Sequence, residues 1–335
     1  MNMKTVGMIS SYKNLTQADW LWKQAPLAFG QWKSTQVLAQ HEKPDYLLLY
    51  QFNFPDYLNT PKRSWKTSLK RGDWRSLLSQ KSQVDEAAKE SVLKLFREVP
   101  KERIFFLVRE PPLPEVASKQ LANYQYAQDY CSYVSGPSES APVPDYMPAI
   151  WYVNIDFQTL NHAPAPEKVR SCSWITSGIN RTQNHQRRLQ FLQSIIEAEI
   201  PVDVYGRGLS SWSNSLGSLE NKWHGMAPYY YNLAIENYAE NDLYVSEKLW
   251  DALLSWCLPI YYGGSAADKL LPPGSFLRLP SLDKKGIEYI KDVTSNTDAW
   301  YDAQQSIAEA RQIILHKLNL LNWLHERIEK LENSL

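Results

Sequence analysis

The sequence YYYNLAIENYAENDLYVSEKLWDALLSWCLPIYYGG, residues 229–264, decides the fold class because it predicts a strand, a loop, a helix and a second strand in succession. Tyr229–Ile235 is a short aromatic and apolar run of high β propensity, as expected of a buried strand. Ser246 is a preferred N-cap residue, and apolar side chains follow it at helical spacing. Leu258–Tyr262 is a second apolar run, which two glycines close. Such a βαβ unit predicts a parallel sheet whose functional loops lie at the carboxyl ends of the strands.

Strands and helices alternate on both sides of this unit, and the whole chain is therefore expected to be an α/β protein. Runs of apolar residues predict further strands at residues 4–11, 46–52, 103–108, 171–176 and 202–206. Apolar residues at helical spacing predict helices at residues 115–129 and 186–198 and a long helical region at 297–331. Prolines are frequent between residues 137 and 166, which predicts a linker near 162–167. We expect domains at residues 1–163 and 168–300, followed by a helical region at 301–335.

The bulk composition excludes several classes of protein. The 335 residues include 36 basic and 36 acidic side chains, and a formal net charge of zero gives no basic footprint for nucleic acid. No window is apolar enough to span a membrane. The three cysteines are odd in number and far apart, which is typical of buried thiols in a reducing compartment. We therefore expect a cytoplasmic protein that has no transmembrane segment and binds no nucleic acid; its oligomeric state is not predicted.

One lysine in the central stretch has an unusual position. Lys248 lies in the first turn of the predicted helix, where the helix dipole disfavours a cation. The amino terminus of a helix binds anions readily, and an added lysine there suits a bound phosphate. The alternative, which position alone favours, is an ordinary solvated lysine.

The same stretch resembles the donor-binding signature of glycosyltransferase family 10, the α-1,3/α-1,4-fucosyltransferases. The residues that match are Glu236-Asn237, Tyr244-Val245-Ser246-Glu247-Lys248, Pro259-Ile260-Tyr261, Gly263 and Ser275-Phe276. Ile235 departs from the family's usual aromatic residue, and the loop before Tyr244 is longer than is common. The resemblance is strong over residues 170–290 and weak elsewhere.

This resemblance implies a soluble, bacterial-type enzyme with two Rossmann-like domains that face each other across a cleft, the architecture called GT-B. It also implies inverting transfer of fucose from GDP-fucose to a hydroxyl of a glycan acceptor. The domain at 1–163 would then be the acceptor side, and the domain at 168–300 would bind the nucleotide sugar. The acceptor glycan and the linkage position are not implied.

Glu110 is the candidate catalytic base. It follows the buried strand predicted at 103–108, and Pro111-Pro112 hold it in an extended turn. Acceptor activation requires a base that removes the hydroxyl proton. From position alone, a loop glutamate without a catalytic role is the more common interpretation. Family 10 has a Glu-Pro or Glu-x-Pro at the matching place, and the resemblance therefore implies that Glu110 is the general base.

Arg188 and Lys248 are the candidate partners of the leaving diphosphate. Arg188 is in phase with the apolar residues Phe191 and Leu192, which places it on the buried face of its predicted helix. A guanidinium there can bind a diphosphate through two hydrogen bonds. A structural salt bridge is the alternative, and Arg187 is a rival for the role. An arginine stands at this offset in family 10, and the resemblance favours Arg188.

Three further residues complete the candidate donor site: Glu247 for ribose or sugar hydroxyls, and Tyr244 and Asn237 as pocket lining. The alternatives are a favourable helix-start charge for Glu247 and packing or turn formation for the other two. Glu236 is expected to be buried and structural. The chain contains no Asp-x-Asp pair that would hold a metal–diphosphate complex, so we expect metal-independent catalysis in which cationic side chains neutralise the diphosphate.

Other functions remain open at this point. One alternative is a glycosyltransferase of the same fold that uses another nucleotide sugar, and a second is a non-catalytic glycan-binding relative. A glycoside hydrolase would use Glu110 and Glu247 as its carboxylate pair, but it has no need of cations beside a helix start. The basic, Trp-bearing residues 61–80 are either a solvated segment or an acceptor or membrane-surface patch.

Overall fold

The computed structural model describes residues 2–11, 18–54 and 90–334. The chain divides into two compact units, Met1–Trp20 with Ser34–Pro144 and Leu21–Lys33 with Asp145–Leu335. The domain boundaries expected from the sequence, near residues 163 and 168, stay a prediction. The basic stretch at 61–80 lies outside the described residues.

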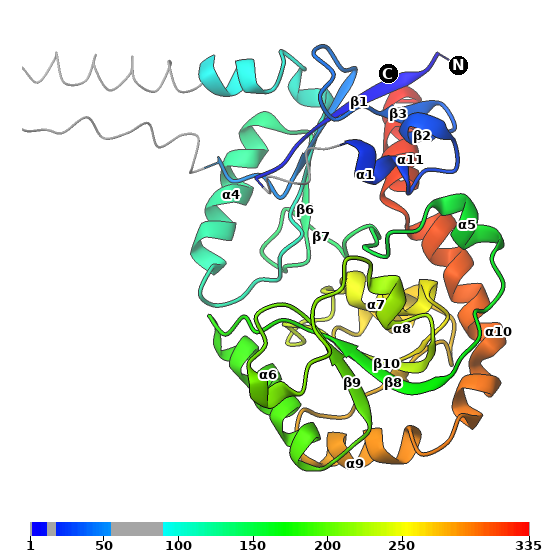
Figure 1. Cartoon of the computed structure of the whole chain (residues 1–335). Coiled ribbons are helices and arrows are strands. Elements are labelled where there is room, and N and C mark those ends of the chain that lie inside the picture. The colour runs from blue at the N-terminus through cyan, green and yellow to red at the C-terminus, as the bar shows by residue number, and fades with distance from the viewer. Residues whose placement is uncertain (1, 12–17, 55–89, 335) are drawn as a thin grey trace, which may run out of the picture. The chain divides into compact units, whose positions relative to one another are not determined.

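The first unit contains a parallel sheet in which the strands follow the order β3-β1-β4-β5-β6-β7. These strands are β1 (Lys4–Ile9), β3 (Thr35–Val37), β4 (Tyr46–Tyr50), β5 (Ile104–Leu107), β6 (Tyr133–Gly136) and β7 (Val143–Pro144). A 3-10 turn, η2 (Lys101–Arg103), precedes β5, and helix α4 (Ala117–Tyr130) packs beside β6 (Figure 1). Strands β4 and β5 are buried along their whole length, as expected for the centre of a parallel sheet.

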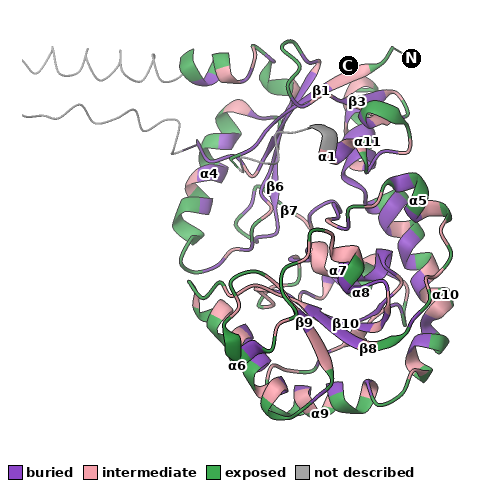
Figure 2. Cartoon of the chain, viewed as in Figure 1, coloured by how far each residue is buried: buried purple, intermediate pink, exposed green. Residues whose placement is uncertain are grey.

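The second unit contains a five-stranded parallel sheet with the order β12-β11-β10-β8-β9. Its strands are β8 (Arg170–Ile175), β9 (Val202–Tyr205), β10 (Tyr229–Ile235), β11 (Leu258–Tyr262) and β12 (Leu277–Arg278). Its helices are α5 (Phe157–His162), α6 (Gln183–Glu197), α7 (Glu247–Leu254), α8 (Ala266–Leu270), α9 (Lys284–Val293), α10 (Asp298–Gln312) and α11 (Leu320–Glu332). Figure 2 shows β10 buried, whereas α6 and α9 each have an exposed side. The shorter elements η3 (Ser211–Ser213) and η4 (Lys222–Gly225) lie between β9 and β10 in the chain. Residues 18–32 contain α1 (Ala18–Trp22), η1 (Ala28–Gly30) and β2 (Gln31–Trp32).

The central stretch folds as its sequence predicts. Strands β10 and β11 have the expected bounds and pair in parallel. Ser246 caps α7, because its hydroxyl accepts a hydrogen bond from the Lys248 N–H at 3.4 Å. Helix α7 packs against both strands. The end of β10 and the start of α7 are therefore close to the carboxyl edge of the sheet, where open α/β sheets bind ligands.

The C-terminal residues are helical, as expected, but the helix is interrupted. A π-helical turn, Ile313–Leu318, follows α10, and α11 begins only at Leu320. Asn319 causes the break because its backbone leaves the helix, with φ −53° and ψ 133°, and its side chain accepts a hydrogen bond from the Leu321 N–H at 2.9 Å. The leucines around the break are buried within the chain and form part of its core.

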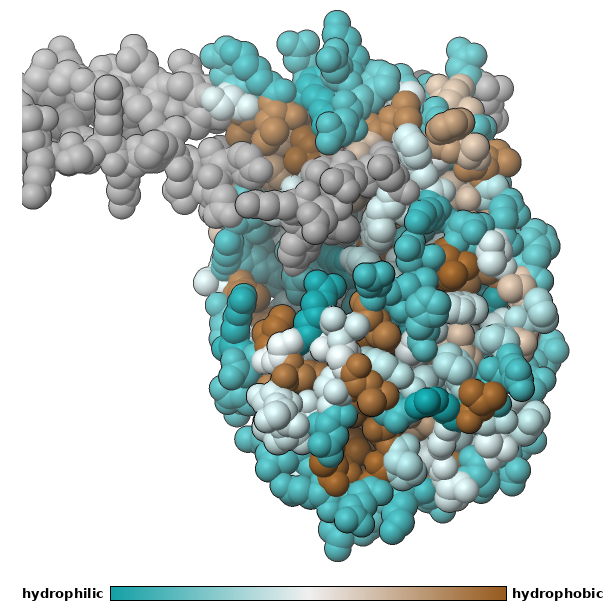
Figure 3. Space-filling model, viewed as in Figure 1, coloured by the Kyte–Doolittle hydropathy of each residue, from teal (hydrophilic) through white to brown (hydrophobic). Residues whose placement is uncertain are grey.

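Both units have parallel sheets connected by helices, which confirms the predicted α/β class. Among the residues with described positions, no helix has both the length and the apolar character needed to cross a membrane. On the face drawn in Figure 3, apolar residues lie in separate patches among hydrophilic ones. The cysteines are buried thiols, as expected: Cys131, Cys172 and Cys257.

Candidate functional site

A buried carboxylate connects the end of β10 to the start of α7. Glu236 directly follows β10, and its carboxylate accepts hydrogen bonds from the Ser246 N–H at 2.8 Å, the Ser246 hydroxyl at 2.7 Å and the Lys248 ammonium at 3.1 Å. Three donors satisfy this buried group, as a charge removed from water requires. A Cβ at Gly263 would come within 2.7 Å of Glu236 Cγ and 2.2 Å of the Tyr261 hydroxyl. The glycine after β11 therefore leaves room for the buried carboxylate.

Lys248 lies at the first turn of α7 with its ammonium among oxygen acceptors. Its Nζ is 3.1 Å from Glu236 Oε2, 3.0 Å from Ser246 Oγ and 3.9 Å from Glu247 Oε1. Burial disfavours the charged form, but the carboxylates of Glu236 and Glu247 outweigh burial and raise the pKa of Lys248. The chain therefore holds a cation at the helix start despite the unfavourable dipole.

A second lysine approaches the same helix turn. Lys222 of η4 places its Nζ 2.7 Å from Asp251 Oδ2 and 3.7 Å from Glu247 Oε1. Asp251 is fully buried and also accepts hydrogen bonds from the backbone N–H groups of Tyr152, at 2.7 Å, and Val153, at 3.3 Å. Against the effect of burial, Asp251 and then Glu247 raise the pKa of Lys222. Glu247 therefore lies between two ammonium groups.

Arg188 points into the interior of the second unit, as its helical phase predicts. Its side chain donates to Asn237 Oδ1 at 2.6 Å, to the Ser177 carbonyl at 2.7 Å and to the Ile179 carbonyl at 3.3 Å. Burial lowers the pKa of Arg188 to about 10, so the guanidinium remains charged at neutral pH. Its Nε is buried and has no hydrogen-bond partner within the described part of the chain. Arg188 thus joins the loop after β8 to Asn237 after β10.

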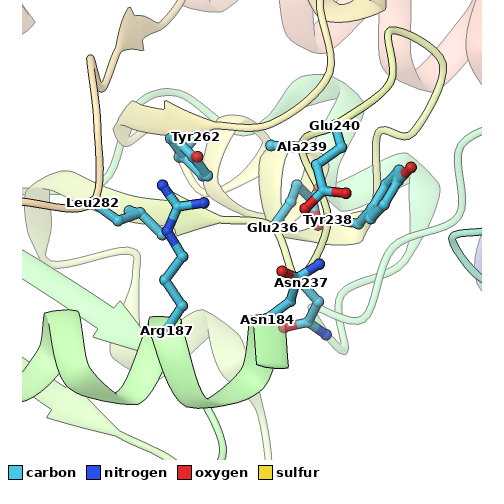
Figure 4. A pocket seen from close by; sticks show the side chains of 9 residues that line it. All are labelled: Asn184, Arg187, Glu236, Asn237, Tyr238, Ala239, Glu240, Tyr262 and Leu282. Carbon is cyan, nitrogen blue, oxygen red and sulfur yellow. The ribbon is translucent and has the colours of Figure 1, made fainter. Parts of the chain in front are cut away.

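Arg187 has a different environment from its neighbour. It is exposed, and its guanidinium lies 5.9 Å from the ring centroid of Tyr262. Figure 4 shows Arg187 and Asn184 extending from α6 toward the residues after β10. The open pocket between them is lined by Asn184, Arg187, Glu236, Asn237, Tyr238, Ala239, Glu240, Tyr262 and Leu282.

Tyr244 is mainly a packing residue in this structure. Its ring is buried and meets Tyr238 edge-on at a centroid distance of 6.5 Å. Its backbone N–H donates to Asn241 Oδ1 at 3.1 Å. The second unit thus brings together Asn237, Tyr244, Glu247 and Lys248 around the end of β10 and the start of α7, with Arg188 bonded to Asn237.

Glu110 belongs to the first unit, where it is exposed three residues after the end of β5. It lines an open pocket whose other residues are Ser11, Gln51, Asn53, Val108, Pro111, Leu113, Val116, Lys119, Gln120 and Asn123. Amides and a hydroxyl lie beside apolar side chains there, a combination that suits a ligand with both hydroxyl groups and apolar faces. The general-base role of Glu110 stays a prediction.

Two features of these sites were not predicted from the sequence. Lys222 is 29 residues from Asp251, and no local pattern connects them. Asp251 does carry a signal, because it is an acid among apolar residues of a buried helix. Gln51, discussed below, has no motif around it.

Among the residues that the structure describes, no group of three or more His, Cys, Asp or Glu could hold a metal ion; metal independence stays a prediction.

Comparison with known proteins agrees with this arrangement. Residues 165–304, which contain the β10–α7–β11 unit, match the C-terminal region of glycosyltransferase family 10 (fucosyltransferase). This part of the chain is a family 10 domain. The resemblance recognised from the donor signature is thereby confirmed for the second half of the chain.

An α-(1,3)-fucosyltransferase of Helicobacter pylori is 34% identical over 98 residues, which are 28% of this chain and 20% of that protein. The curated relatives that this chain matches are covered over less than a third of their own length.

Solved structures show the same fold at low sequence identity. An α1,3-fucosyltransferase with GDP-fucose has a TM-score of 0.50 and 14% identity, with 98% of this chain and 90% of that chain covered. An α-glucosyltransferase in complex with UDP and a 13-mer DNA has a TM-score of 0.54 and 10% identity, with 99% and 100% covered. These likenesses confirm the predicted GT-B type of α/β fold.

Proposed function

We propose that this chain is an inverting family 10 glycosyltransferase that transfers fucose from GDP-fucose to a hydroxyl of a glycan acceptor. The observation that carries the proposal is the Lys248 ammonium, held at the start of α7 inside the region that matches the fucosyltransferase family. An ammonium has three N–H donors. Glu236 and Ser246 accept two of them, and the third can reach a phosphate oxygen.

The donor diphosphate would be bound by cations and helix N–H groups. Lys248 contributes its ammonium and the α7 dipole adds positive potential. Arg188 contributes through its buried charge and its bond to Asn237, and the exposed Arg187 is the second arginine near the same loop. Glu247 would accept hydrogen bonds from ribose or sugar hydroxyls, and Tyr244 would support the loop. Cationic stabilisation of the leaving GDP would need no metal ion.

The acceptor would be activated in the pocket of the first unit. Glu110 is exposed to that pocket and would remove the proton from the attacking hydroxyl. The acceptor oxygen then forms a bond to the anomeric carbon as the bond to the GDP oxygen breaks, which inverts the configuration. The three buried thiols support a reducing, cytoplasmic setting for this reaction.

A GDP-release assay with GDP-fucose and a panel of small glycans tests the proposal. We expect turnover that survives EDTA and is lost in Glu110→Gln, while that variant still binds GDP in calorimetry. Lys248→Ala should weaken GDP binding, whereas Lys284→Ala, which removes an exposed lysine of α9, is the matched control. Turnover with another nucleotide sugar and none with GDP-fucose would contradict the assignment of GDP-fucose as the donor. Nucleotide-sugar binding without turnover on any glycan would indicate a non-catalytic relative.

A further inference from the structure

Two side-chain amides hold the backbone of the turn that carries Glu110. Gln51 Oε1 accepts hydrogen bonds from the backbone N–H groups of Arg109, at 2.7 Å, and Glu110, at 3.1 Å. On the other side of the turn, Gln120 Nε2 donates to the Glu110 carbonyl at 3.0 Å. The peptide groups on both sides of the Glu110 Cα are therefore held by two side chains, that of Gln51 after β4 and that of Gln120 in α4.

Gln51 adopts a backbone conformation that costs energy. It directly follows β4 and has a φ of 51°, in the left-handed region that residues with a Cβ rarely adopt. Backbone strain of this kind persists only where the surrounding structure maintains it, and it is concentrated at functional sites. The Gln51 N–H donates to the Leu107 carbonyl at 2.7 Å, and its own carbonyl accepts from the Ser11 N–H at 3.3 Å.

The neighbouring polar residues make this corner rigid. The Asn53 N–H donates to Ser11 Oγ at 2.9 Å, and the Phe54 N–H donates to Asn123 Oδ1 at 2.9 Å. Asn53 and Asn123 are both buried. Gln51 is therefore tied through its backbone to both neighbouring strand ends while its side chain reaches the Glu110 turn.

We propose that Gln51 is a positioning residue that fixes the Arg109–Glu110 turn, so that the Glu110 carboxylate is presented to the first-unit pocket in the geometry that acceptor activation needs. The inference rests on the proposed function, because it assigns Gln51 a role through Glu110. A single amide oxygen that accepts two successive backbone N–H groups sets the direction of the turn. Pro111 and Pro112 restrict the chain on the far side.

Gln51→Met keeps the approximate size of the side chain and removes the acceptor oxygen. Both N–H groups then lose their partner, and the turn can rotate. A misplacement of about 1 Å can reduce a rate about 100-fold. We expect kcat to fall by about 10- to 100-fold, with little change in KM for GDP-fucose, because the donor residues are in the other unit.

Hydrogen exchange at the backbone amides of Arg109 and Glu110 tests the same role without using activity. In Gln51→Met the exchange of both amides should accelerate at least tenfold, whereas Gln51→Glu, which retains an oxygen at that place, should keep both protected. Gln125→Met is the matched control, because Gln125 is an exposed glutamine of α4 in the same unit. Thermal unfolding of all variants identifies any general loss of folding.

The outcomes separate the positioning role from the reaction. Faster exchange of the two amides together with a lower kcat supports the proposal. Unchanged exchange, or faster exchange with an unchanged kcat, overturns it. If Glu110→Gln itself retains full activity, the proposed base is wrong, and the exchange result then reports only whether Gln51 holds the turn.

Discussion

Lys168 is a buried cation of the second unit whose removal should change how stability depends on pH. Only 8% of its surface is exposed, and its ammonium donates to the carbonyls of Ala227 at 2.8 Å and Ser255 at 3.0 Å. The ring centroid of Trp300 lies 5.9 Å from the Nζ. Burial lowers the pKa of Lys168 from 10.5 to about 8.

The sign of the effect follows from this lowered pKa. Between pH 8 and pH 10.5 the unfolded chain binds a proton at Lys168 that the folded chain has released. Folding stability should therefore rise with pH through this window. One pKa unit corresponds to about 1.4 kcal/mol, so the charged form costs the folded state about 3 kcal/mol at and below neutral pH. Burial raises the pKa of the neighbouring Cys257 to about 11, above the window.

Lys168→Met isolates this contribution, because titrating groups that do not interact with Lys168 cancel in the comparison with the wild type. Lys168 lowers the pKa of Cys257, so its removal moves that pKa further above the window. The free energy of unfolding is measured in guanidinium chloride at pH 7 and at pH 10 by tryptophan fluorescence. The wild type should gain about 2 to 3 kcal/mol relative to Lys168→Met between these pH values. Lys284→Met, at a lysine whose side chain is 89% exposed, is the control. A difference that stays constant with pH would show that the folded protein does not release the Lys168 proton in this range.

Three further substitutions test the second unit. Lys248→Met should raise the dissociation constant of GDP about 10- to 100-fold, because a charge-assisted bond contributes about 1.5 to 3 kcal/mol; unchanged affinity in calorimetry would exclude a phosphate contact. Asp251→Asn should lower the free energy of unfolding by about 3 to 5 kcal/mol, because Lys222 loses its buried partner, and urea denaturation measures the loss. Arg188→Lys should cost about 1 to 3 kcal/mol in the same assay, because one ammonium cannot bond to both Asn237 and the loop carbonyls, and an equal stability would contradict this reading.

The sequence predicts the β10–α7–β11 unit closely because its signals are local. Strand runs, an N-cap and apolar spacing each act over a few residues, so the bounds of both strands and the cap at Ser246 are confirmed. The interruption at Asn319 was not predicted, because apolar spacing continues through a residue whose backbone departs from the helix. Helical phase also distinguished two adjacent arginines, since Arg188 is buried with Phe191 whereas Arg187 is exposed.

The long-range contacts of the site could not be predicted in this way. Gln51 reaches residues 58 and 59 positions later in the chain, and nothing in its sequence neighbourhood indicates an amide at the end of β4 with a positive φ. The partner of Lys248 is likewise set by folding. The family signature contains Glu236 and Lys248, but only the structure shows their charges 3.1 Å apart.

The charges around α7 show why neighbouring residues in the signature have separate tasks. Glu236, Glu247 and Asp251 supply three carboxylates, and Lys222, Lys248 and Arg188 supply three cations, so this group is balanced before any ligand binds. Because the net charge of this group is zero, it cannot by itself neutralise the negative charge of a bound diphosphate. Binding of the diphosphate would then depend on interactions that act at short range. These are hydrogen bonds from nearby N–H donors, the α7 dipole and the exposed Arg187. If the proposed donor binds here, the buried ion pairs would serve mainly to hold Lys248 in one orientation, and the affinity would come from the few N–H groups directed at the diphosphate.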